Sequence, residues 1–96
     1  MKVQKVRRVV GQIIPLLASY GQQDKAGWLG NESALLGDAR LSDMAVSEAF
    51  QRLHRIVPGM GGLMDLPLAG LSREEETIAR ETLDKLANEL YELTDD

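Results

Sequence analysis

Residues 72–93 read SREEETIARETLDKLANELYEL, and this stretch decides the fold class. Its apolar side chains recur at spacings of four and three residues, which is the period of one face of an α-helix. Ser72 and Glu75 have the spacing of a capping box, in which the serine accepts from the third amide and the glutamate reaches back to the cap. The stretch predicts a helix over about 73–93 with a leucine seam for packing on another helix. The seam consists of Ala79, Leu83, Leu86, Leu90 and Leu93.

The first twenty residues carry a second helical pattern, because apolar side chains return every three or four positions from Val3 to Tyr20. We expect a helix over about 2–20 that Gly21 ends. Pro15 cannot donate a hydrogen bond within this helix, so we expect a kink close to it.

Two further helices are expected in the middle of the chain, over about 24–36 and 42–57. The earlier one begins with Asp24 as its N-cap and ends at Gly37. The later one has the clearest apolar stripe in the chain and ends at Pro58. The residues expected to be buried are Trp28, Leu29, Leu35 and Leu36 in the earlier helix and Val46, Ala49, Phe50, Leu53, Ile56 and Val57 in the later one.

Together these patterns predict an all-α fold, a single-domain bundle of about four helices over residues 1–96. A long apolar, glycine-rich loop, residues 58–71, joins the third and fourth helices. A chain of 96 residues leaves no length for a second core, and 44% hydrophobic residues suffice for one. The chain has no cysteine, which excludes disulfides and thiolate metal sites.

The loop contains GMGGLMDLPL at residues 59–68, an apolar run in which Asp65 is the single charge. Surface loops are usually polar, so this one is either packed into the fold or presented to a partner. The side chains of Met60, Leu63 and Met64 suit both alternatives, and the sequence leaves both open. A phosphate cradle is disfavoured, because no strand leads into the glycines and no Lys-Ser or Lys-Thr pair follows them.

Charge is distributed unevenly along a chain whose formal net charge is −4. The only charged residues among the first twenty are Lys2, Lys5, Arg7 and Arg8, whereas nine acidic and three basic residues follow from Ser72 onward. An acidic end disfavours general binding to nucleic acid and suits a basic protein partner. Alternatively, the first and last helices pack together and partly neutralise each other, and both interpretations can hold.

The sequence contains no evident catalytic constellation. His54 is the only histidine and lies at the edge of an apolar stripe, so we interpret it as a structural residue rather than a catalytic one. We therefore expect no enzymatic activity, no cofactor and no metal site. No apolar run approaches the ~20 residues of a membrane span, and Gln12 and Pro15 interrupt the one run that imitates a signal peptide. We expect a cytoplasmic protein that binds no membrane.

Four short motifs follow one another along the chain. They are Tyr20-Gly21, Gly27-Trp28-Leu29, Gly37-Asp38, and Gly59-Met60-Gly61-Gly62 with Asp65 three residues later. In this order they resemble a family of small helical bacterial proteins whose activity is not established. The resemblance implies a helical fold and an important central loop, and it implies no reaction. Pro58 and Met64 depart from the family's pattern.

These observations favour a non-enzymatic protein-binding domain, most concretely an immunity protein that binds and neutralises a toxin domain such as a nuclease. An acidic last helix can mimic a phosphate backbone toward a basic active site. The alternative is a small structural or regulatory protein that self-associates, as a homodimer for example, through the loop or the leucine seam. The expected partner-binding residues are Met60, Leu63, Met64 and Asp65 in the loop and Glu74, Glu75 and Glu81 in the last helix.

Overall fold

Four α-helices make up the fold in the computed structural model, which describes residues 2–58, 62–63, 66–68 and 72–95. They are α1 (Lys2–Ser19), α2 (Gln23–Leu36), α3 (Asp43–Ile56) and α4 (Arg73–Leu93). No strand occurs within the described ranges. The predicted all-α bundle, with its long connection between the third and fourth helices, is confirmed.

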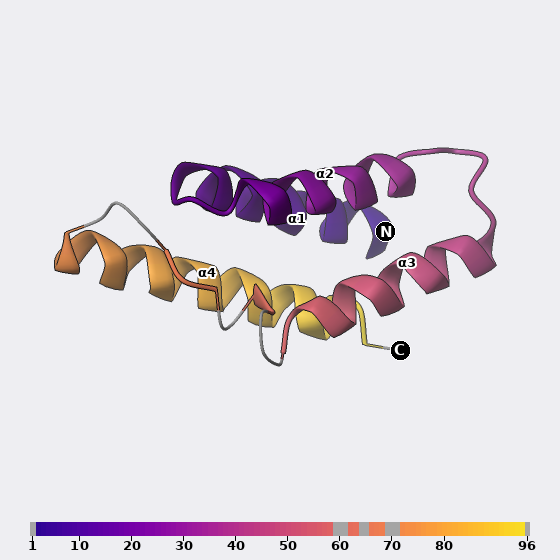
Figure 1. The fold of residues 1–96 in the computed structure, drawn as a ribbon. Helices are drawn as coiled ribbons and strands as arrows, with labels where there is room; N and C mark the ends of the chain where they lie inside the picture. The colour runs from indigo at the N-terminus through magenta and orange to yellow at the C-terminus, as the bar shows by residue number, and fades with distance from the viewer. Residues whose placement is uncertain (1, 59–61, 64–65, 69–71, 96) are drawn as a thin grey trace.

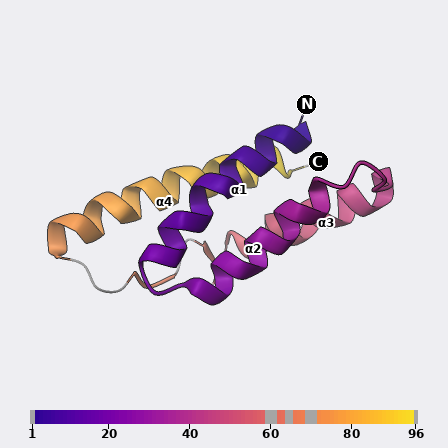
Figure 2. The same cartoon turned by 90° about the horizontal axis from the view of Figure 1, so that it is seen from above.

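The helices form two layers, with α1 and α2 in one layer and α3 and α4 in the other (Figure 1). The main packing contacts are those that α1 makes with α2 and with α4. Seen from above, α1 lies over α4, while α2 lies over α3 (Figure 2). Both chain termini lie at the same end of the molecule, where Lys2 Nζ donates to the Asp95 carbonyl oxygen at 3.4 Å. The bundle is elongated, with extents of 44 × 22 × 21 Å.

The core lies between the two layers and is built from the apolar stripes that the sequence predicted. The leucine seam of α4 is part of it, because four of its five residues are buried and Leu93 is partly buried against them. The seam therefore packs inside the molecule, mainly against α1. The principal core residues of α1, α3 and α4 are Val6, Val10, Ile13, Leu17, Ala49, Phe50, Leu53, Ala79, Leu83, Leu86 and Leu90.

The turn between α1 and α2 depends on a glycine. Gly21 has a φ of 87°, in the left-handed region where an L side chain is strained. This conformation lets the Gln22 N–H donate to the Leu17 carbonyl oxygen at 2.9 Å, which closes the end of α1 as predicted. α1 itself runs through Pro15 as one helix from Lys2 to Ser19.

Two details of the α2 prediction are wrong. Asp24 is not the N-cap: the helix begins at Gln23, and Gln22 occupies the cap position without a side-chain hydrogen bond. Packing against α1 stabilises this start without a polar cap, because tertiary contacts outweigh capping. Leu35 is not buried but 38% exposed, since it lies off the stripe that faces α1, whereas Leu29 and Leu36 are in the core.

Gly37 ends α2 as predicted, but for a reason that the sequence does not reveal. Its φ is −79°, so it is not the left-handed glycine of a typical helix C-terminus. A Cβ at Gly37 would lie 2.9 Å from Cζ of Arg7, so the missing side chain leaves space for that guanidinium. Nε of Arg7 donates to the Ser33 carbonyl oxygen at 3.0 Å and ties α1 to the last turns of α2.

Candidate protein-binding surface

Three leucines in the described part of the loop between α3 and α4 belong to the core. Leu63 is 0% exposed, and Leu66 and Leu68 are also buried in the main hydrophobic cluster. Of the two alternatives for the loop, the packed one therefore applies to these three leucines, and Leu63 is not available to a partner in this conformation. The candidate residues Met60, Met64 and Asp65 lie outside the described residues.

A glycine is required at position 62, where the loop returns to the end of α3. A Cβ built on it would lie 2.5 Å from the carbonyl oxygen of Pro58, 2.7 Å from that of Ile56 and 2.8 Å from that of Val57. The loop backbone is thus seated directly on the carbonyl groups at the end of α3. Only a residue without a side chain permits so close an approach.

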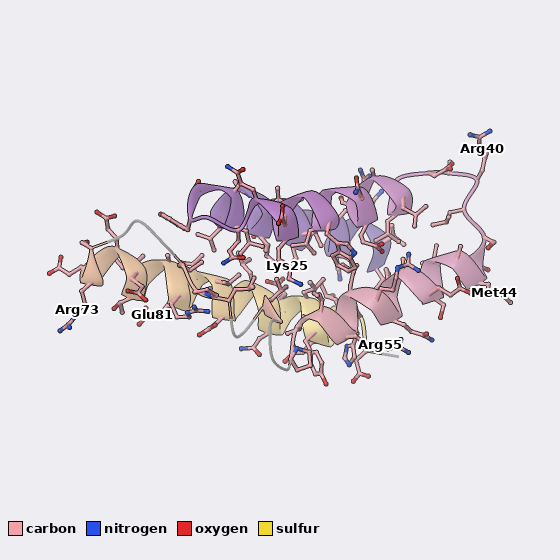
Figure 3. The ribbon with its side chains drawn as sticks, in the orientation of Figure 1. Lys25, Arg40, Met44, Arg55, Arg73 and Glu81 are labelled. Carbon is pink, nitrogen blue, oxygen red and sulfur yellow. The ribbon has the colours of Figure 1, made fainter. Side chains whose placement is uncertain are left out.

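The acidic candidates on α4 lie on the surface. Every residue from Ser72 to Ile78 is exposed, and so is Glu81. In both ribbon views the first turns of α4 extend beyond the turn between α1 and α2, so no other helix covers them (Figures 1 and 2). Figure 3 shows the side chains of Arg73 and Glu81 pointing away from the bundle. The structure therefore presents Glu74, Glu75 and Glu81 together on a projecting helix end.

At the centre of these glutamates lies an apolar residue that the sequence analysis missed. Ile78 is 66% exposed, and Glu74 and Glu75 precede it by four and three residues, while Glu81 follows it by three. Residues at these spacings are neighbours on a helix surface, so the three carboxylates surround the isoleucine. We call these four residues the Ile78 patch. The sequence signal was an isoleucine outside the leucine seam in an otherwise polar part of the helix.

Two hydrogen bonds hold the start of α4 in place. Ser72 is the N-cap, and its hydroxyl accepts from the Glu75 N–H at 3.3 Å, which confirms the serine half of the predicted capping box. About two turns into the helix, Nη2 of Arg80 donates to the carbonyl oxygen of Leu66. This second bond ties the projecting helix to the buried loop, so the Ile78 patch is carried by an anchored element.

Two basic residues of α1 lie beside the end of α4 that is opposite the Ile78 patch. Lys5 and Arg8 line a groove of about 450 Å³ together with Glu89 and Leu93 from the last turns of α4. This supports the interpretation that the first and last helices pack together. Because the contact is with the second half of α4, the α1 cations leave the carboxylates of the Ile78 patch exposed.

His54 connects the end of α3 to the end of α4. Its ring stacks on Tyr91 with a centroid distance of 3.8 Å, and its Nδ1 lies 3.0 Å from the Tyr91 carbonyl oxygen and 3.2 Å from Oγ1 of Thr94. These contacts support the structural interpretation of this histidine. Across the described part of the chain, no three His, Cys, Asp or Glu side chains are grouped so that they could hold a metal ion.

Comparison with known proteins gives no match. No family model matches the chain, and no similar curated protein or solved structure was found. The resemblance noted from the sequence motifs therefore stays a prediction. Within the residues that the structure describes, no helix has the length and apolar character needed to cross a membrane.

Proposed function

We propose that this chain is a protein-binding domain that uses the Ile78 patch to bind a basic partner, and that it acts as an immunity protein against a nuclease toxin. The observation that carries the proposal is an isoleucine that is 66% exposed and surrounded by three glutamates on a projecting helix end. Isolated apolar side chains on a surface are common, but this one combines exposure with three neighbouring glutamates against one cation, Arg73, which lines the same hollow as Glu74 and Ile78.

The charge of the patch defines the class of partner. Active sites that bind nucleic acid are rich in lysine and arginine, because they must neutralise phosphates. Glu74, Glu75 and Glu81 offer such a site three carboxylates in place of phosphates. Complementary charge of this kind accelerates association and loses strength as salt is added.

The apolar centre distinguishes a protein partner from a free cation or a polyamine. Binding energy in protein interfaces concentrates in a few side chains that are fully desolvated at the centre, while the polar rim excludes water. Ile78 has this central position, with the carboxylates as the rim. A matching partner surface has a small apolar pocket bordered by lysine or arginine.

The self-association alternative receives no support from the described residues. It required the leucine seam or the loop as the contact. The seam is packed inside the bundle, and so are the loop residues Leu63, Leu66 and Leu68.

Co-expression with the product of the neighbouring gene tests the proposal. That product alone is expected to stop growth, and this chain is expected to restore it. The variant Glu74→Gln/Glu75→Gln/Glu81→Gln should lose the rescue, whereas Glu48→Gln, an exposed glutamate on α3, should keep it. Rescue that is unchanged in the triple variant, or a neighbouring product with no effect on growth, would count against the proposal.

A further inference from the structure

A second surface feature, remote in sequence from the Ile78 patch, lies between the start of α2 and the end of α3. It is a groove of about 510 Å³, a volume within the range of small-molecule sites. The side chain of Lys25 reaches from α2 toward the layer formed by α3 and α4 (Figure 3). The groove is lined by Gln22, Asp24, Lys25, Trp28 and Ile56.

The apolar part of the groove consists of Trp28 and Ile56. Both side chains are partly buried, and both pack against the hydrophobic core. Packing against the core therefore fixes one side of each side chain, while the other side remains accessible to solvent. An indole beside an aliphatic side chain is suited to covering a short hydrocarbon chain.

The polar part of the groove has one cation, Lys25, for which the described residues provide no partner. Lys25 is partly buried, and it forms no hydrogen bond or ion pair with any residue in the described ranges. The amide of Gln22 is uncharged, and one of its two N–H donors is used by the hydrogen bond from Nε2 to the Pro67 carbonyl oxygen at 2.7 Å. The Lys25 ammonium, with three donors, is thus the cationic group in the groove's lining that is available to an anion.

We propose that this groove binds a small amphiphilic monocarboxylate free in solution. The hydrocarbon chain lies on Trp28 and Ile56, and the carboxylate accepts hydrogen bonds from the Lys25 ammonium. The carboxylate of Asp24 also lines the groove and repels a second negative charge, which favours a monoanion over a dianion. The inference is independent of the proposed function, because it uses different residues and a different class of ligand.

Trp28 provides the test, because it is the only tryptophan in the chain. Titration with decanoate below its micellar concentration is expected to give a saturable change in Trp28 emission, with calorimetry as a second readout. The variant Lys25→Gln should bind decanoate about tenfold or more weakly, the loss expected for one charge-assisted hydrogen bond. The matched variant Lys85→Gln, which removes an exposed cation on α4, should bind like the wild type.

Decyltrimethylammonium, with the same chain and the opposite charge, separates the proposal from unspecific binding of amphiphiles. It is expected to bind at least tenfold more weakly than decanoate. Absence of saturable decanoate binding by calorimetry would overturn the proposal. So would equal affinity for the two amphiphiles, or equal affinity of the Lys25→Gln variant and the wild type.

Discussion

Replacing Gly62 by alanine tests the packing of the loop on α3. The new Cβ would lie 2.5, 2.7 and 2.8 Å from three backbone carbonyl oxygens. Backbone atoms at the end of a helix cannot rotate away as a side chain can, so the loop and the helix end must separate. Gly62 is not among the described glycines with positive φ, so an alanine there meets this steric conflict without backbone strain.

The expected magnitude follows from two opposing terms. Overpacking in a well-packed site costs typically about 1–3 kcal/mol. Replacing glycine by alanine also lowers the entropy of the unfolded chain, which offsets about 0.4–1 kcal/mol of that cost. The midpoints of these two ranges differ by roughly 1.3 kcal/mol, so we expect Gly62→Ala to lower the free energy of unfolding by about 1–2 kcal/mol.

Gly30→Ala is the matched control, with the opposite sign. Gly30 lies inside α2, and a Cβ built there has no atom within 4 Å. Alanine is favoured over glycine in a helix interior by about 0.5–1 kcal/mol, so this variant should be more stable than the wild type. Urea unfolding followed by circular dichroism measures both changes as shifts of the midpoint. A Gly62→Ala variant at least as stable as the wild type would refute the seating of the loop on the α3 carbonyls.

Two further predictions concern stability. Leu63→Ala should lower the free energy of unfolding by about 2–5 kcal/mol, because the side chain of Leu63 is fully buried. Ile78→Ala, at an exposed site, should change it by about 0.5 kcal/mol or less. Equal losses of the two variants in urea unfolding would contradict the assignment of core and surface. Arg52→Ala should lower the free energy of unfolding by about 1–3 kcal/mol, because Nε and Nη2 of Arg52 donate to the nearly buried Glu32 carboxylate at 3.0–3.2 Å. A melting temperature unchanged from the wild type would show that this link between α2 and α3 is dispensable.

The helices were predictable because their apolar residues follow the helical period. In α3 and α4 the expected stripes are the ones that face the core, since an amphipathic helix has only one face that it can bury. In α2 the prediction was weaker. The glycines Gly27 and Gly30 blur its pattern, so the buried side is decided by contact with α1, and Leu35 falls outside it.

The candidate surface was only partly predictable. The glutamates of α4 stand out in the sequence, but their exposure together with Ile78 depends on how far α1 and α2 extend along α4. That distance is a property of tertiary structure. The location of the loop leucines, in the core or at an interface, also depends on tertiary structure. Leucines such as Leu63 suit both. The burial of Leu63 and the approach of Gly62 to the backbone carbonyl oxygens at the end of α3 decide for packing there.

The most direct test of the proposed function is the affinity of this chain for its proposed toxin partner, the product of the neighbouring gene, compared between wild type, Ile78→Ala and Met44→Ala. Met44 is 73% exposed and lies at the other end of the molecule from Arg73, so it controls for the loss of any exposed apolar side chain (Figure 3). We predict that Ile78→Ala loses about 2 kcal/mol of binding energy, a roughly 30-fold higher Kd, while Met44→Ala binds like the wild type. A Kd that is unchanged in Ile78→Ala would contradict the claim that the Ile78 patch is the contact surface.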